Sequence, residues 1–431
     1  MPRLLRHLDP RPFFTSRVAR SRSFRTFWVG QSVSQLGAAI SLAAIPLIAA
    51  IIVGVTPAQM GILAALETAP ALIFTIPAGV LADKADRRVI LIGADLARAV
   101  AIGLIPLGAM TGHLSFELMA LVAFVMGSLG IVFDVTYEGF MTEVIEIEDL
   151  TEGFQKLEVT ASGAGVIGPG IGGVLLSAAG AALTIGLNAI SYLVSAASLF
   201  LTHRRADLVR VVSAPSNLRG ELSAGLRLVF ADRILRDLTI STAMLNLGSG
   251  IVIPLIVIFA TRNLGLNAGE YGLLYSITST GFVLGASSVG LFGRRLGSGR
   301  GLTIAATGFA FSILLVPMAS PGFGVLFLVA ARFLNSASNT TFRVLLMSLI
   351  QTRADPAFRS RITSAERMIT WGALPIGSLV GGALASGAPG MVGALVVAGI
   401  MPLVGVLILR TGPVWRVRLD SLKLTKESAS A

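Results

Sequence analysis

Ionisable side chains occur inside long apolar stretches of this sequence. Glu67 stands near the middle of one stretch, with no charged residue within ten positions. A charge inside an apolar span is costly, so such a group is first interpreted as functional. Desolvation disfavours the charged form, and an isolated carboxylate there is expected to be neutral for much of the time. Glu67 would then carry a proton or bind the cationic end of a substrate, or serve as a structural acid hydrogen-bonded to another helix.

Two further apolar stretches hold charged residues at helical spacing. Asp95 and Arg98 are three positions apart, share one helix face and can pair. We expect a structural or gating pair there rather than a substrate site. Asp134 and Glu138 are four apart, which also places them on one face. They would carry a proton or take part in gating, or form an ion pair with the arginines at 87–88.

The clearest polar stripe combines a cation with hydrogen-bonding side chains. Its members follow one another at spacings of four, three and four residues, which puts them on one helical face: Arg332, Ser336, Asn339 and Arg343. An arginine cannot lose its charge in a protein. Arg332 must therefore face a carboxylate, in an interhelix salt bridge, or line a cavity.

The composition shows which elements must position these groups. The chain has 431 residues, of which 54% are hydrophobic and only 13% charged, with a mean hydropathy of +0.81. Soluble domains carry about 25% charged residues, so an ordinary soluble enzyme, a nucleic-acid-binding module and a disordered protein are excluded. There are no cysteines and only three isolated histidines. We therefore expect no metal site, no cofactor and no enzyme activity.

Twelve stretches are long and apolar enough to cross a membrane as helices, which need about 20 residues each. They are 28–53, 59–82, 89–110, 116–143, 156–179, 182–202, 236–260, 269–292, 301–319, 322–350, 364–386 and 391–410. The predicted fold class is an all-α polytopic membrane protein. A polar linker at 203–235 divides the chain into two six-helix halves. The expected parts are a basic arm (1–27), an N-terminal half (28–202), this linker, a C-terminal half (236–410) and a tail (411–431).

The positive charges predict the orientation of these spans. With the N-terminus in the cytoplasm, the cytoplasmic segments hold 30 of the 34 Lys and Arg residues, and the outer loops hold only Arg262. We therefore expect both termini in the cytoplasm and a multi-pass protein of the cell inner membrane. This distribution explains the net charge of +11 without a nucleic-acid partner. The expected partners are the lipid bilayer, a small molecule and protons, and we expect a monomer.

The loop after the second span carries a recognisable motif. Residues 79–88 read GVLADKADRR, an acid beside two arginines that could form an ion-pair latch at a helix end. The stretch resembles the G-x-L-A-D-R-x-G-R-R signature of the major facilitator superfamily, matched by Gly79, Leu81, Ala82, Asp83, Arg87 and Arg88. Asp86 stands where that family usually has glycine. A degenerate second copy begins at Gly290, 211 positions later, and supports an internal repeat.

The fifth span contains a second motif, Gly168-Pro169 followed by Gly172-Gly173. It is similar to the G-P-x-x-G-G antiporter motif of superfamily exporters. Proline bends a helix and glycine permits close packing, so the motif favours export or is simply a packing device.

Other stretches resemble the macrolide-efflux and enterobactin-exporter-like branch. They are FRTFWVGQSVSQLG at 24–37, FDVTY at 133–137, KLE at 156–158 and WGALPIG at 371–377. The resemblance covers about 24–410 and implies that the first, fourth, seventh and tenth helices line a central cavity. The first and seventh then offer Gln31, Ser34, Gln35, Ser41, Thr242, Asn246 and Ser249. Branch members often have an acid at the position of Ala38, so a proton site is absent there.

The expected function is proton-coupled export of an amphipathic small molecule, such as a drug or a siderophore, by alternating access. The chain contains no G-x-x-x-x-G-K-[ST] signature for a nucleotide, which argues against ATP as energy source. A lysophospholipid flippase is the alternative within transport. A non-transporting sensor or scaffold is less favoured, because buried charges and a gate-like loop suit transport.

Overall fold

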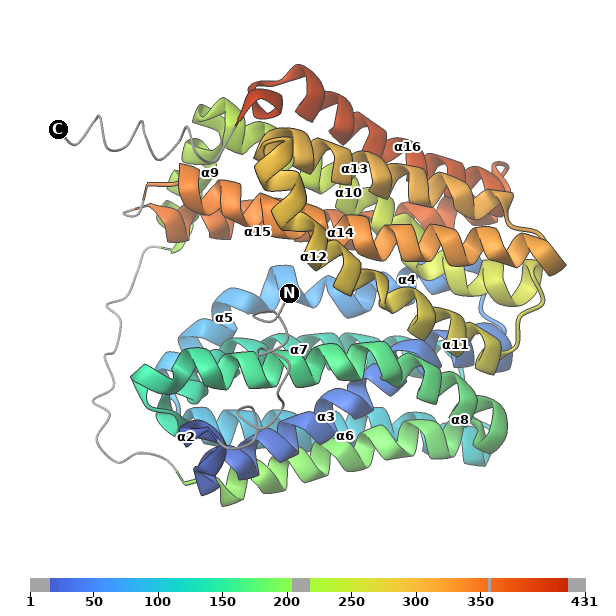
Figure 1. The fold of residues 1–431 in the computed structure, drawn as a ribbon. Coiled ribbons are helices and arrows are strands. Elements are labelled where there is room, and N and C mark those ends of the chain that lie inside the picture. Colours follow the sequence, from blue (N-terminus) through green and yellow to red (C-terminus); the bar gives the residue numbers. More distant parts are fainter. Residues whose placement is uncertain (1–15, 204–217, 356–357, 418–431) are drawn as a thin grey trace, which may run out of the picture. The chain divides into compact units, whose positions relative to one another are not determined.

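The computed structural model describes residues 16–203, 218–355 and 358–417 (Figure 1). Most of the predicted basic arm, residues 204–217 of the linker and residues 418–431 of the tail lie outside the described residues. In the described ranges the regular structure consists of helices, with no strand, as an all-α membrane fold requires.

The N-terminal half begins with a short helix, α2 (Arg17–Arg20), and Ser16 is its N-cap. The helices that follow are α3 (Arg22–Leu47), continued by the π-helix η2 (Ile48–Val53), then α4 (Pro57–Thr68), α5 (Pro70–Lys84), α6 (Arg87–Thr111), α7 (Phe116–Val144) and α8 (Leu150–Leu201). Most connections between them are only a few residues long, as in a bundle of antiparallel helices.

The C-terminal half repeats this order of elements. It contains α9 (Leu218–Ala231), α10 (Arg233–Ile258), continued by the π-helix η4 (Phe259–Asn263), then α11 (Ala268–Ser279), α12 (Gly281–Arg295), α13 (Ser298–Leu315), α14 (Val325–Arg353), α15 (Arg359–Ser386) and α16 (Gly390–Thr411). The helix α9 is amphipathic and precedes the first span of this half.

The helices amount to the twelve predicted spans. Ten helical segments of the described residues are long and apolar enough to cross a membrane. That number counts α8 as one segment, although its 52 residues form two helices that meet at Gly180. The φ of Gly180 is 76°, in the left-handed region that glycine adopts readily. It leaves out α14, which carries the polar stripe of Arg332 and Arg343. Dividing α8 at Gly180 and adding α14 gives twelve.

The beginning of each half repeats in detail. The helix α4 starts at a capping box formed by Thr56 and Gln59, and α11 starts at a capping box formed by Asn267 and Glu270, 211 positions later. Each preceding span contains a proline and ends in a π-helix. The same offset of 211 separates the two copies of the loop motif, so the sequence repeat is also a repeat of local backbone structure.

The described helices form two compact units that do not coincide with the halves of the sequence. One unit comprises residues up to Ile45 together with Ile73–Ser213, and the other comprises Pro46–Leu72 together with the chain from Ala214 onward. Residues 46–72 therefore pack with the C-terminal helices, α10 and α15 in particular. We call residues 46–72 the exchanged hairpin. Prolines 46 and 70 lie at or near its two ends, where a missing backbone N–H weakens the helix.

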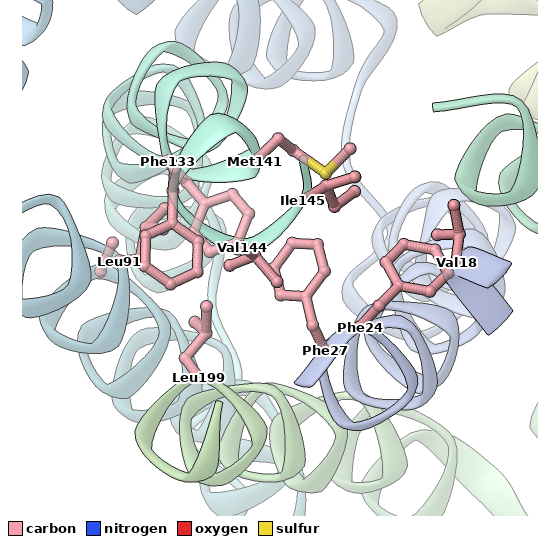
Figure 2. Packing of buried hydrophobic residues seen from close by; sticks show 11 residues of the cluster. Val18, Phe24, Phe27, Leu91, Phe133, Met141, Val144, Ile145 and Leu199 are labelled. Carbon is pink, nitrogen blue, oxygen red and sulfur yellow. The ribbon is translucent and has the colours of Figure 1, made fainter. Parts of the chain in front are cut away.

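Aromatic side chains make the core of the first unit at the end that holds the 79–88 loop. Phe24 and Phe27 of α3 pack against Phe140 and Met141 of α7, and each of the four is at most 1% exposed (Figure 2). Leu91 of α6 completes the cluster from a third helix. Because these side chains come from helices distant in sequence, the cluster fixes the packing of this end of the bundle.

Candidate substrate and gating sites

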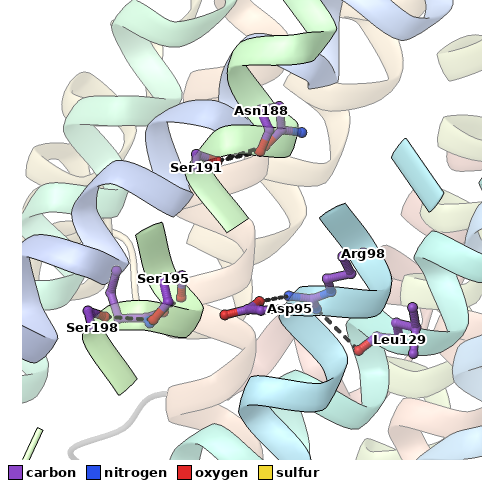
Figure 3. Close-up of polar contacts among 8 residues, drawn as sticks. Asp95, Arg98, Leu129, Asn188, Ser191, Ser195 and Ser198 are labelled. Carbon is purple, nitrogen blue, oxygen red and sulfur yellow. Dashed lines mark hydrogen bonds and ion pairs between the residues drawn. The ribbon is translucent and has the colours of Figure 1, made fainter. Parts of the chain in front are cut away.

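The Asp95–Arg98 pair of α6 lies buried within the first unit. Arg98 Nη1 donates to Asp95 Oδ1 at 3.4 Å, and Arg98 Nη2 donates to the carbonyl oxygen of Leu129 on α7 at 3.2 Å (Figure 3). The guanidinium carbon also lies 4.5 Å from the ring centre of Phe133 and 5.5 Å from that of Tyr192. One cation thus holds together α6, α7 and α8, which fits the structural or gating interpretation of the pair.

A seam of small polar side chains joins α3 to α8. Gln31 Nε2 donates to Ser195 Oγ at 2.9 Å, and Asn188 Nδ2 donates to Ser41 Oγ at 2.7 Å. Gln31 is only 2% exposed. The expectation that it lines a cavity is therefore corrected: its amide is used in helix packing and is not available to a substrate here. Gln35, one turn later on α3, is exposed and stays a candidate.

Asp134 and Glu138 of α7 both have exposed side chains. Among the described residues, no ion pair joins either acid to Arg87 or Arg88, which was the predicted alternative. Arg87 pairs with other acids, and Arg88 lies over the ring of Phe200 at 5.5 Å.

The motif loop between α5 and α6 is tied to α7 by Arg87. Arg87 Nη1 lies 3.3 Å from Glu143 Oε1 and also donates to the carbonyl oxygen of Gly139, whereas its Nη2 lies 3.9 Å from Asp83 Oδ1. Asp86 adopts an extended conformation and caps α6 by accepting a hydrogen bond from the Arg88 amide at 2.8 Å. The backbone at this position is one that any residue can adopt, so glycine is not required, and the aspartate side chain caps the helix that follows.

The glycines of the antiporter-like motif pack α8 directly onto α3. A side chain at Gly168 would meet Ala39, and one at Gly172 would meet the backbone of Ile40. Pro169 and Gly173 are buried beside them. This arrangement accounts for the motif as a close-packing device between the first and fifth spans, whatever direction the transport takes.

Glu67 lies at the end of α4, directly before the break at Ala69 and Pro70. Its side chain is exposed, and no cation lies within ion-pair distance of it among the described residues. Among the described residues, Glu67 also forms no side-chain hydrogen bond to another helix.

The candidates of the C-terminal half have different surroundings. Asn246 of α10 donates from Nδ2 to the carbonyl oxygen of Thr370 on α15 at 2.7 Å, so its amide ties two helices together. Asn339 of α14 is half-buried. The Arg332 guanidinium lies 5.4 Å from the ring centre of Tyr275 on α11. No carboxylate of the described residues is within ion-pair distance of Arg332, so the predicted salt bridge is absent from this part of the chain.

The exchanged hairpin is held to the C-terminal helices by backbone contacts. Arg262 Nη2 donates to the carbonyl oxygens of Val55 at 2.8 Å and Ala50 at 3.1 Å. The Ala58 amide donates to Ser386 Oγ at 3.0 Å. Gly61 lies so close to the backbone of α15 that a side chain would meet the carbonyl oxygen of Ser378. These contacts gather at the end of the second unit that the charge distribution predicts to face outward.

The buried charged residues to which the sequence assigned no site role include Glu143, Lys156 and Glu366. Glu143, which is 8% exposed, is the closest acid to Arg87. Lys156 is 2% exposed and pairs with Glu152 at 3.2 Å. Glu366 of α15 is 4% exposed. Each lies near a helix end, where a charged residue is ordinarily expected to be exposed to solvent. The spacing of residues in the sequence therefore did not predict that these side chains are buried.

A family model described as transmembrane secretion effector matches residues 16–428. The chain belongs to this family. The match confirms the resemblance to major facilitator transporters on which the motifs at 79–88 and 168–173 had been interpreted. A comparison with curated proteins finds no match.

Solved structures of several transporters share the fold of this chain. A bacterial homologue of the iron transporter ferroportin, in an inward-facing state, is 16% identical, with a TM-score of 0.74 over 92% of this chain and 99% of the other. The nucleoside transporter NupG is 14% identical, with a TM-score of 0.71 over 93% and 99%. A bacterial homologue of the human lysosomal transporter Spinster, inward-facing and occupied, is 15% identical, with a TM-score of 0.68 over 94% and 98%. At these identities the likeness establishes the fold and not the substrate.

Proposed function

We propose that this protein is a secondary active transporter that exports an amphipathic small molecule, such as a drug or a siderophore, in exchange for protons. Its family and fold are those of membrane transporters. The observation that carries the proposal is the exchanged hairpin, which is continuous with the N-terminal helices but packs with the C-terminal ones. Alternating access needs an element that closes one side and can change its partners.

The ends of the exchanged hairpin support this role. Pro46 lies in the helix that enters it, and Pro70 follows the break through which the chain leaves it. Backbone bending at prolines lets a hairpin move without unfolding the spans on either side. Its contacts with α15 and Arg262 include hydrogen bonds and a close approach at Gly61, and hydrogen bonds of this kind can be exchanged for others during a cycle.

Protons are the proposed coupling ion. Glu67, Asp134 and Glu138 are acids with exposed side chains inside spans, as a proton carrier needs. We place Glu67 slightly ahead, because it adjoins the break at Ala69 and Pro70 and has no cation beside it. Asp134 and Glu138 are the competing pair.

Export direction and orientation belong to the same proposal. The resemblance of the glycines at 168–173 to the motif of exporters supports the direction, and the positive charges of the loops support both termini in the cytoplasm; the proposed protein is a monomer of the inner membrane. Cysteine labelling tests the orientation cleanly, since the chain has no native cysteine. An impermeant thiol reagent should leave Ser216→Cys unmodified in intact cells, and labelling there would overturn the topology.

The decisive experiment is a panel of substrates in proteoliposomes with an imposed pH gradient. We expect uptake of at least one amphipathic compound into vesicles that is driven by the gradient and abolished by a protonophore. Gradient-independent movement of every compound tested would contradict proton coupling. No movement of any compound at all would instead favour a sensor or scaffold.

A lysophospholipid flippase is the second candidate. The half-buried Arg332 beside Tyr275, without an acid of the described residues to pair with it, suits a phosphate group. A fluorescent lysophospholipid included in the same vesicle panel separates the two candidates, because an exporter of drugs or siderophores would leave its distribution between leaflets unchanged.

A further inference from the structure

The strongest unexplained charge in the spans is Arg332 of α14. It lies seven residues after the start of a 29-residue helix, about 10 Å along the axis at 1.5 Å per residue. The whole helix is about 43 Å long and the apolar core of a bilayer is about 30 Å thick, so a centred α14 places the backbone of Arg332 just inside one boundary of the core. A permanent cation at that depth needs a counter-charge or water.

The surrounding helices offer no acid to neutralise it. The sequence has no Asp or Glu between Glu270 and Asp355. That interval contains most of α11 and all of α12, α13 and α14, and the other three all pack against α14. Glu270 itself belongs to the capping box at the first turn of α11, where it accepts from the Asn267 amide at 2.9 Å.

The groups that do face Arg332 are aromatic and can donate hydrogen bonds. The guanidinium lies over Tyr275, whose ring centre is 6.4 Å from that of Tyr271, one turn earlier. Tyr271 is 3% exposed and Arg332 is half-buried, so the tyrosine is enclosed while part of the arginine side chain is accessible. The neighbouring amide of Asn335 is directed away, since its Nδ2 donates to Ser312 Oγ at 3.0 Å.

The chemistry of this cluster selects one class of ligand. A guanidinium has five N–H donors and no acceptor, and a tyrosine adds a hydroxyl donor. Carboxylates and phosphates match the fork of an arginine with paired, charge-assisted hydrogen bonds. The two tyrosine rings provide an apolar, polarisable wall for the adjoining part of the ligand.

We propose that Arg332, with Tyr275 and Tyr271, forms a binding site for an oxyanion, and that the molecule which this protein carries presents a carboxylate or phosphate group to it. The inference rests on the proposed transport function and specifies the substrate as an anionic amphiphile. The ligand then supplies the counter-charge that the helices α11 to α14 lack. A site of this kind would be neutralised only when loaded, which favours cycling with substrate over cycling without it.

The test uses four ligands with the same chain and different head groups: octanoate, octyl phosphate, octanol and octylammonium. Their apparent dissociation constants are measured from the thermal stabilisation of the full-length protein in phosphatidylcholine nanodiscs. We expect the wild type to bind octanoate or octyl phosphate about tenfold or more tightly than octanol, with octylammonium weakest. The stronger of the two anions distinguishes a carboxylate substrate from a phosphate one.

Variants assign this preference to the cluster. Arg332→Gln should lose the preference for anions, while Arg332→Lys should retain part of it because the charge remains. Arg410→Gln, at the last turn of α16, removes one positive charge elsewhere and should bind like the wild type. If Arg332→Gln does not fold, the comparison of the wild type with Arg332→Lys and the charge preference of the wild type itself still decide the matter.

The result that overturns the proposal is equal binding of the anionic and neutral ligands by the wild type, or an anion preference that survives in Arg332→Gln. Either would assign Arg332 a structural role. The transport experiment tests the proposed function independently of this site. Gradient-driven export without a preference for anions would contradict the oxyanion site but not the proposed function. Anion binding without transport would contradict the proposed function but not the site.

Discussion

Arg262 Nη2 lies 2.8 Å from the carbonyl oxygen of Val55, across 207 positions of sequence. The arginine is the only Lys or Arg in the predicted outer loops, and it is used to hold the exchanged hairpin to the C-terminal helices. The positive-inside rule does not explain an arginine in an outer loop, but the structure gives Arg262 a role as a hydrogen-bond donor to backbone carbonyl oxygens. The contact suggests where the transport cycle opens and closes.

Covalent closure of this contact should stop the cycle. The Ala58 amide lies 3.0 Å from Ser386 Oγ, so cysteines at these two positions are close enough for a disulfide. We expect oxidised Ala58→Cys/Ser386→Cys to transport at the background rate and to recover on reduction. Each single-cysteine variant, treated with the same oxidant, is the control. Full transport by the cross-linked protein would show that the hairpin does not move.

The ion pairs of the motif loop should differ in what they contribute. Asp83 lies 3.9 Å from Arg87 and is half exposed, whereas Glu143 lies 3.3 Å from Arg87 and is mostly covered. We expect Asp83→Asn to impair transport severalfold with little change in thermal stability, since exposed pairs contribute at most about 1 kcal/mol. Glu143→Gln should impair transport and also lower the melting temperature, because it leaves Arg87 short of its closest partner.

Transport and melting temperature are compared at equal amounts of protein in the membrane. Wild-type transport by Asp83→Asn would show that this acid is no latch. A melting temperature of Glu143→Gln equal to that of the wild type would mean that Arg87 finds another partner, such as Asp83.

The proton carrier can be assigned by three isosteric variants in one vesicle assay. Glu67→Gln keeps shape and hydrogen-bonding capacity but cannot titrate, so it should abolish gradient-driven export while leaving insertion intact. Asp134→Asn and Glu138→Gln are the matched comparisons. Retained coupling in Glu67→Gln together with its loss in Asp134→Asn or Glu138→Gln would transfer the role to the α7 pair.

The glycine motif of α8 should be sensitive to a single methyl group. A Cβ at Gly172 would meet the backbone of Ile40, which cannot yield as a side chain tip does, so Gly172→Ala should destabilise by about 1–3 kcal/mol. Gly163→Ala is the control on the same helix, since no atom lies within 4 Å of its Cβ position. Thermal unfolding in detergent measures both variants. Equal melting temperatures would show that α3 and α8 are not held in this contact.

The spans and the repeat could be predicted from the sequence because they depend on local chemistry. A helix in a bilayer satisfies its own backbone, so about 20 apolar residues suffice to define a span wherever it packs. The offset of 211 between the two motif copies likewise reappears in the capping boxes at Thr56 and Asn267, since caps are made by neighbouring residues.

The partners of the polar side chains were decided only by tertiary structure. Gln31 and Gln35 are equally polar and four residues apart, yet one is buried against Ser195 and the other is exposed. The spacing of a stripe establishes which residues share a face but not what lies opposite that face. For the same reason the sequence singled out Arg332 but could not decide between a salt bridge and a cavity. The packing of α11 to α14 leaves the guanidinium beside Tyr275, and no carboxylate of the described residues lies within ion-pair distance of it.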